Sequence, residues 1–166
     1  NKSIFLLPLK QISNLIYDID ELEPMQEILS RYFGTIRDLF RYYAATLGSG
    51  GNLLLFRKSA WLKFCQEMRF IDEDQLTTKD LSKLFGRCGG VPNEEGSSRQ
   101  SDEGPTEAIQ GLMRYEFLEL IVRTSLQKYH TKSKTRKKEF DLLSPSEAIR
   151  RFMDKDILPY AFTTDH

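Results

Sequence analysis

Apolar side chains recur at intervals of three and four residues along most of this 166-residue sequence. The longest example lies between residues 25 and 47, where the apolar residues are Met25, Ile28, Leu29, Tyr32, Phe33, Ile36, Leu39, Phe40, Tyr43 and Leu47. This spacing places apolar groups on one face of an α-helix. No segment has the sustained apolar-polar alternation that is typical of a half-buried β-strand. The pattern therefore predicts an all-α fold.

Capping and helix-breaking residues divide the pattern into separate helices. Pro24 suits the first turn of the longest helix, because a missing N–H costs nothing there. The run 48–51, Gly-Ser-Gly-Gly, ends that helix. Ser59 is the predicted N-cap of a second helix, whose apolar residues are Trp61, Leu62, Phe64, Cys65 and Met68.

Three further helices follow in the sequence. Thr77 or Thr78 is predicted to cap the first of them, with Asp80 in its first turn, where a negative charge is favourable. A strong apolar pattern then covers residues 108–129. Residues 144–147, Ser-Pro-Ser-Glu, combine an N-cap, a proline at the first helical position and a capping-box glutamate. They predict the start of a last helix.

Between the third and fourth helices lies a long polar segment. The third helix is predicted to end at Gly86 and Gly89-Gly90. Residues 89–107 then contain almost no apolar side chains. Burial within this segment is too small to offset the entropy lost on ordering it. We therefore expect residues 89–107 to be a mobile insertion.

Composition restricts the class of protein. Lys plus Arg equals Asp plus Glu at 24 each, and this balance argues against a dedicated nucleic-acid binder. The longest apolar runs, such as residues 4–7 and 53–56, are too short to cross a bilayer. The first residues lack the pattern of a signal peptide. Two cysteines, Cys65 and Cys88, are too few for a disulfide framework. We expect a cytoplasmic protein with reduced thiols.

A helix, a glycine-rich loop, a short apolar run and a second helix form the outline of an EF-hand. A calcium-binding loop supplies oxygen ligands at positions 1, 3 and 5 and a bidentate glutamate at position 12. With Leu55 at position 8, these four positions hold Gly48, Gly50, Asn52 and Ser59. No carboxylate is present, so calcium is not expected to bind this loop.

A second unit has the same outline. With Leu112 at position 8, Glu116 occupies position 12, but positions 1, 3 and 5 hold Pro105, Glu107 and Ile109. A further acidic start, Asp18-Ile19-Asp20, reaches leucine at positions 5 and 12 and is interpreted as a solvated loop. We therefore predict no metal site and no cofactor.

Two adjacent segments, residues 64–72 and 75–85, resemble the core signature of the tubulin polymerization-promoting protein family, also called the p25-alpha domain. In that family, as in this chain, the first segment is a helix that ends in a basic-hydrophobic-Ile-Asp turn. The second segment is a helix that begins with hydrophobic-Thr-x-x-Asp and ends in Phe. Residues 37–45 and 113–120 resemble that family's opening and final helices. The resemblance covers about residues 35–122. It implies an EF-hand-like fold without calcium sites and a cytoskeletal setting.

The chain also departs from that family. The insertion replaces a short basic link, and residues 1–32 and 130–166 have no counterpart. We expect one helical domain over residues 1–166. It consists of an EF-hand-like pair of helix-loop-helix units with degenerate loops, together with extra N- and C-terminal helices. Residues 1–33 form the N-terminal helices, residues 34–130 the EF-hand-like core, and residues 131–166 a basic connector and the C-terminal helix.

The connector is the candidate partner-binding site. Its basic residues are Lys132, Lys134, Arg136, Lys137 and Lys138. They would attract an acidic protein surface, such as that of tubulin, or phosphate groups. A solvated linker has the same composition, so this alternative stays open.

Other residues of chemical interest are interpreted as structural. Trp61 is expected in the core rather than exposed as a partner anchor, and Cys65 is expected to act as a small apolar side chain. Cys88 is expected to be an ordinary loop thiol. His130 and His166 are the only histidines, and no G-x-S-x-G, P-loop or H-E-x-x-H motif is present.

These observations predict a non-catalytic protein–protein interaction module of a cytoskeletal or ciliary, microtubule-associated protein. Its partner would be tubulin or another cytoskeletal protein, with no nucleic acid and no membrane. The alternative is a calcium-responsive EF-hand regulatory domain with non-standard ligands. An unrecognised hydrolase or transferase is the third class.

Overall fold

The computed structural model of this chain describes residues 19–47, 55–73, 76–90, 111–130 and 142–161. Its five helices are α2 (Leu22–Leu47), α3 (Lys58–Glu67), α4 (Thr78–Phe85), α5 (Arg114–Tyr129) and α6 (Pro145–Arg151). Short helical turns precede α2 and extend α4 and α6, namely η2 (Ile19–Glu21), η3 (Gly86–Gly90) and η5 (Phe152–Ile157). No strand is found in these ranges, which confirms the predicted all-α class.

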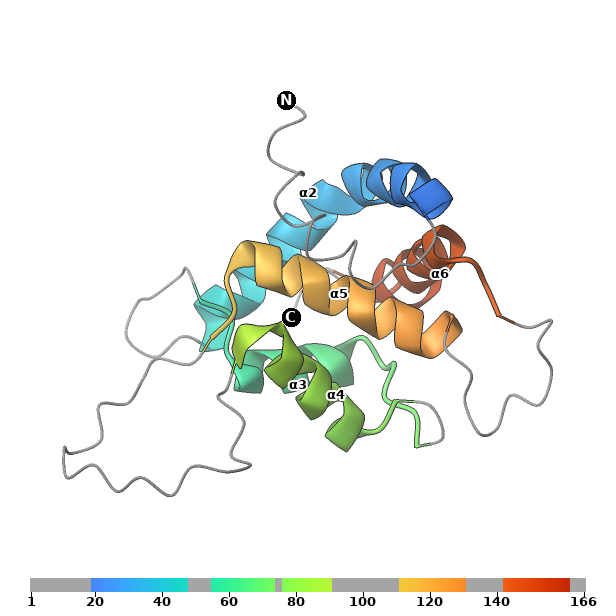
Figure 1. Cartoon of the computed structure of the whole chain (residues 1–166). Helices are drawn as coiled ribbons and strands as arrows, with labels where there is room; N and C mark the ends of the chain where they lie inside the picture. The colour runs from blue at the N-terminus through green and yellow to red at the C-terminus, as the bar shows by residue number, and fades with distance from the viewer. Residues whose placement is uncertain (1–18, 48–54, 74–75, 91–110, 131–141, 162–166) are drawn as a thin grey trace, which may run out of the picture.

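Helix α5 runs through the middle of the molecule, with α2 on one side and the α3–α4 pair on the other (Figure 1). Helix α6 contacts both α2 and α5. The central position of α5 follows from the middle of its sequence, where the apolar run Leu120–Val122 lies between the apolar residues Phe117 and Leu118 and the small polar residues Thr124 and Ser125. Its buried residues are Phe117, Leu118, Glu119, Leu120, Ile121, Val122, Thr124, Ser125 and Leu126.

Aromatic side chains fill the centre of the core. The Phe117 ring lies 4.4 Å from the Phe56 ring, 5.7 Å from that of Phe40 and 6.0 Å from that of Phe64, measured between centroids. Phe85 on α4 is also buried. Phe85 and Phe117 are thus buried on two helices, α4 and α5, that contact one another.

The C-terminal helix belongs to the same core. Ile149, Phe152, Met153 and Ile157 are completely buried. Phe152 packs against Phe70, with ring centroids 5.2 Å apart. Residues 142–161 therefore continue the hydrophobic core that α2 and α5 begin.

The loops that precede α3 and α5 meet in a single antiparallel pair. The backbone N–H of Phe56 donates to the carbonyl of Leu112, and the N–H of Leu112 donates to the carbonyl of Phe56, both at 2.8 Å. The sequence placed Leu55 at this position, one residue too early. Phe56 pairs because its ring packs in the core, whereas Leu55 is only half-buried, and a shift of one residue exchanges the two faces.

Two predicted helix starts were wrong. Helix α3 begins at Lys58 with Arg57 at the N-cap, and Ser59 is an exposed residue inside its first turn. Helix α5 begins at Arg114 rather than Ala108, because residues 111–113 are extended where they pair with Phe56. Pairing between two loops cannot be seen in local spacing.

Capping was predicted more accurately. Thr77 caps α4, where its hydroxyl accepts from the N–H of Asp80, and the Asp80 carboxylate accepts from the N–H of Thr77 in return. Ser144 caps α6, with Pro145 at the start of that helix. The predicted capping box is incomplete. The Glu147 carboxylate binds Arg150 and does not accept from the N–H of the N-cap residue, Ser144.

The helical segment continues past Gly86, the first glycine of the predicted helix end, and stops at the second, Gly89-Gly90. Gly86 has helical dihedral angles, and the chain continues through η3 as far as Gly90. Residues 89 and 90, assigned to the insertion, thus belong to an ordered turn, and residues 91–107 lie outside the described residues. No helix of the described ranges is long and apolar enough to cross a membrane.

Candidate functional site

Glu116, the residue predicted at position 12 of the second loop, caps a helix. Its Oε1 accepts from the backbone N–H of Met113 at 2.9 Å. Its other oxygen lies against Gly89, since a Cβ added to Gly89 would fall 2.0 Å from Glu116 Oε2. Within the described ranges, no group of three or more His, Cys, Asp or Glu side chains is arranged to hold a metal ion.

The sequence interpretation of Trp61 and Cys65 agrees with the structure. Both side chains are completely buried, and Trp61 Nε1 donates to the carbonyl of Leu81 at 2.9 Å, which joins α3 to α4. Burial raises the pKa of the Cys65 thiol. A protonated thiol in an apolar site is a poor nucleophile.

Cys88 was predicted to be a loop thiol, and this was wrong. It lies in η3 and is buried. Burial, with a smaller contribution from the negative charge of Glu119, raises the pKa of Cys88 to about 12. Glu119 is itself buried and is paired with Arg123, whose Nη2 lies 2.8 Å from Oε1. Cys88 therefore packs against α5 as a protonated thiol.

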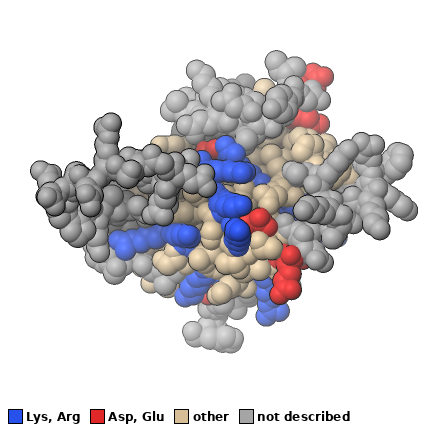
Figure 2. Space-filling model, turned by 60° about the horizontal axis from the view of Figure 1, so that its bottom comes forward, with Lys and Arg blue, Asp and Glu red and all other residues tan. Residues whose placement is uncertain are grey.

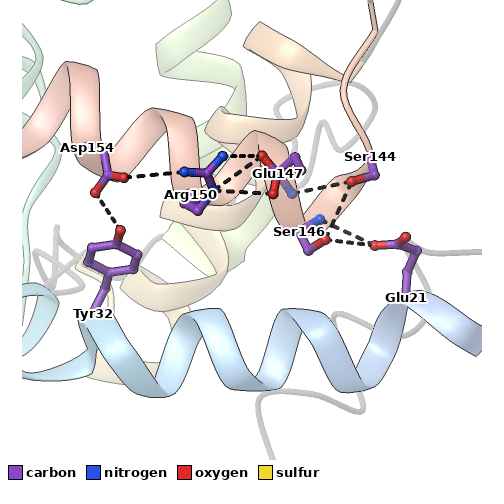
Figure 3. Close-up of polar contacts among 7 residues, drawn as sticks. All are labelled: Glu21, Tyr32, Ser144, Ser146, Glu147, Arg150 and Asp154. Carbon is purple, nitrogen blue, oxygen red and sulfur yellow. Dashed lines mark hydrogen bonds and ion pairs between the residues drawn. The ribbon is translucent and has the colours of Figure 1, made fainter.

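A polar network joins α2 to the C-terminal helix (Figure 3). The Tyr32 hydroxyl donates to the carboxylate of Asp154. Arg150 Nη1 lies 4.0 Å from Asp154 Oδ2, and its Nε donates to Glu147 at 3.2 Å. The Arg150 guanidinium lowers the pKa of the Glu147 carboxyl. Each of these carboxylates has a partner, so the network orients α6 on α2.

Further along the same interface, Ser146 contacts Glu21, the last residue of η2, directly before α2. Its hydroxyl donates to Glu21 Oε2 at 3.1 Å, and its hydroxyl lies 3.4 Å from that of Ser144 (Figure 3). At the end of α5, His130 Nδ1 lies 2.8 Å from the carbonyl of Leu143. These contacts fasten the C-terminal segment to the core.

The surface of α4 and η3 carries a distinct feature, which we name the basic stripe: Lys79, Lys83 and Arg87. The three residues are spaced four apart and all are exposed. The opposite side of the same helix is apolar and buried, through Leu81, Leu84, Phe85 and Cys88. Helical spacing therefore places the three cations along one open face.

Among the described residues, none forms an ion pair or hydrogen bond with the side chain of Lys79, Lys83 or Arg87. Elsewhere, basic side chains often have acidic partners: Arg123 binds Glu119 at 2.8 Å and Lys128 binds Asp156 at 2.9 Å. Like charges four residues apart repel one another and weaken a helix. No acidic side chain of the described residues offsets this repulsion, whereas Lys83 and Arg87 lie in the last turns of α4 and η3, where a positive charge is favourable.

Figure 2 views the side of the molecule that carries α3 and α4, which lies at the bottom of Figure 1. Blue Lys and Arg atoms cover more of the visible face than red Asp and Glu atoms. The sequence contained a signal for this surface, namely basic residues at every fourth position of a predicted helix. The basic run at 132–138 is denser and was therefore the stronger sequence signal.

The residues predicted to bind a partner, Lys132, Lys134, Arg136, Lys137 and Lys138, lie outside the described residues. Comparison of the chain with protein-family models, with curated proteins and with solved structures gives no match. The basic stripe is therefore the candidate site that the described structure itself provides.

Proposed function

We propose that this chain is a non-catalytic, metal-independent protein-interaction module that binds an acidic protein surface. The observation that carries the proposal is the basic stripe. Its three exposed cations have no partner among the described residues and create a local positive potential on a chain whose total charge is balanced. Such a patch attracts negatively charged surfaces and accelerates association with them.

The proposed architecture is EF-hand-like. The backbone pair between Phe56 and Leu112 supports it, because paired EF-hand loops meet through one short antiparallel contact. The capping role of Glu116 supports metal independence, since its Oε1 already accepts from a backbone N–H. In this proposal the Glu116 carboxylate holds the second loop in the place of a cation.

The absence of catalysis is also a proposal. Its support is the state of the described nucleophiles, since Cys65 and Cys88 are buried and their pKa values are raised. A thiol must ionise before it attacks a substrate. The described carboxylates of the α2–α6 network are engaged with Tyr32, Ser146 and Arg150.

For the partner we propose a cytoskeletal protein, with microtubules of the cytoplasm or of a cilium or flagellum as the first candidate. The support is the resemblance of residues 64–85 to the p25-alpha signature, together with the positive charge of the stripe and of the connector at 132–138.

Cosedimentation with microtubules tests the proposal. The stripe variant combines Lys79→Gln, Lys83→Gln and Arg87→Gln. The connector variant changes all five basic residues of the connector to glutamine. The control variant removes the same number of charges as the stripe variant from α2, by Arg31→Gln, Arg37→Gln and Arg41→Gln.

We expect the stripe variant to sediment less than wild type at low salt, and the control variant to behave as wild type. The difference should decrease as salt rises, because the Debye length falls to about 8 Å at physiological ionic strength. If wild type does not sediment at any salt concentration, tubulin is not the partner. If stripe and control variants lose binding equally, net charge rather than the stripe determines association.

A further inference from the structure

We infer that the basic stripe binds an extended acidic segment of its partner, in which carboxylates occur at alternate residues. This inference rests on the proposed function and specifies the chemistry of the partner at that site. It is drawn from the spacing of Lys79, Lys83 and Arg87 and from the open surface around them.

The spacing of the stripe matches an extended chain. Four residues of an α-helix advance by about 6 Å, so the three cations extend over about 12 Å along α4 and η3. In an extended chain, side chains two residues apart point to the same side and lie about 6.6–6.8 Å from one another. Three acidic residues at alternate positions therefore cover about 13 Å and face all three cations together.

The surface beside the stripe is open to a backbone. Gly86 lies between Lys83 and Arg87 in the sequence, and a Cβ added there would meet nothing within 4 Å. The nearest acidic residue on the helix, Asp80, does not compete for the stripe. Its carboxylate accepts from the N–H of Thr77 at 3.1 Å and from the Thr77 hydroxyl at 2.8 Å.

An acidic helix fits this surface less well. Helices pack through interdigitating side chains with apolar groups at the contact. The exposed surface of α4 and η3 offers no apolar side chain, only the hydrocarbon stems of the basic residues. The exposed residues described there are Thr78, Lys79, Lys83, Arg87 and Gly89. An extended segment can be held by charge pairs and does not need an apolar contact surface.

Nucleic acid is also disfavoured. Proteins that bind single strands combine positive charge with exposed aromatic rings on which bases stack. The aromatic residue of α4 is Phe85, and it is buried. The chain as a whole carries equal numbers of acidic and basic residues. The stripe is therefore assigned to a polypeptide.

The test is an NMR titration of the whole ¹⁵N-labelled chain with two peptides of identical composition. Each has nine residues, three glutamates and six threonines. In the alternating peptide, single threonines separate the glutamates. In the spaced peptide, three threonines separate them, which places the carboxylates about 13 Å apart in an extended chain. Threonine disfavours helix formation in both peptides.

We expect the alternating peptide to shift the amide signals of residues 78–90 and to bind about threefold more tightly than the spaced peptide, because it forms one or more additional charge pairs. The stripe variant should bind it about tenfold more weakly, and the control variant should bind as wild type. Equal affinity for the two peptides, with binding still lost in the stripe variant, would overturn the extended register and leave the proposed function intact.

Two further probes address the other occupants. Tighter binding of a lactam-closed helical peptide, with glutamate at every fourth residue, would assign the stripe to an acidic helix and overturn the inference. Tighter binding of oligothymidylate would assign it to nucleic acid. If the stripe variant binds every probe as well as wild type does, the stripe is not a binding site, and the proposed function loses the observation that carries it.

Discussion

The carboxylate of Glu116 and the backbone of Gly89 lie in direct contact, so that even a methyl group at residue 89 would come within 2.0 Å of Oε2. Gly89 has a φ of +116°, in the region that side chains other than glycine rarely adopt. The other oxygen of Glu116 caps α5. One carboxylate thus connects the end of η3 to the start of α5.

Gly89→Ala should lower the free energy of unfolding by about 1–3 kcal/mol, because alanine is strained at this φ and displaces the capping carboxylate. Gly34→Ala is the matched control. Gly34 lies inside α2, and a Cβ there would meet nothing within 4 Å. That substitution should raise stability by about 0.5–1 kcal/mol. Urea denaturation measures both, and equal effects would contradict the contact.

Glu116→Ala should cost about 1 kcal/mol through loss of the cap. The loss should be the same in millimolar calcium and in a chelator, because the carboxylate serves the backbone rather than a cation. Calcium should also leave the melting temperature of the wild-type chain unchanged, since a ligand bound by the native state would raise it. A rise in melting temperature that Glu116→Ala abolishes would favour the calcium-responsive alternative.

Phe117→Ala should destabilise the chain by about 3–5 kcal/mol. The ring is completely buried and packs against Phe40, Phe56 and Phe64. Tyr115→Ala, two residues earlier on a side chain that is 44% exposed, should change stability by no more than about 0.5 kcal/mol. Chemical denaturation measures the free energy of unfolding of both variants. Similar losses in the two variants would mean that Phe117 lies outside the core.

Tyr32 should make stability depend on alkaline pH. Burial, together with the hydrogen bond to Asp154, raises the pKa of Tyr32 to about 12, whereas an unfolded tyrosine ionises near pH 10. The folded state therefore holds this proton more tightly. The stabilising contribution is complete below about pH 10 and is lost as pH rises through about 12.

Tyr32→Phe removes this titration. The difference in unfolding free energy between wild type and Tyr32→Phe should be constant from pH 7 to 9 and should then fall by at most about 1.4 kcal/mol per pH unit. Urea denaturation at intervals of half a pH unit measures the difference. A difference that stays constant up to pH 11 would show that the Tyr32–Asp154 hydrogen bond does not favour the protonated hydroxyl.

Much of the local structure could be predicted from the sequence. The helix expected from about residue 24 is found at Leu22–Leu47, Thr77 caps α4 with Asp80, and Trp61 is buried as expected. These features depend on spacing and capping within one or two helical turns. Because neighbouring residues determine these features, the local sequence is sufficient to predict them.

The surface site was only half visible in the sequence. The four-residue spacing of Lys79, Lys83 and Arg87 can be read directly. The sequence does not reveal that they lack an acidic partner within the described residues, because folding can bring a carboxylate from any part of the chain against them. Basic residues at other positions acquired such partners, as Lys128 did from Asp156.

The sequence by itself determined which segments are helices and which of their faces are apolar, since a helix is held by contacts between residues three and four apart. Only the tertiary structure decided that Phe56 rather than Leu55 pairs with Leu112, that α5 begins at Arg114, and that Cys88 is buried. Each of these outcomes depends on segments distant in the chain that compete for one core, and the packing of large rings such as Phe117 selects among registers that local spacing leaves equivalent.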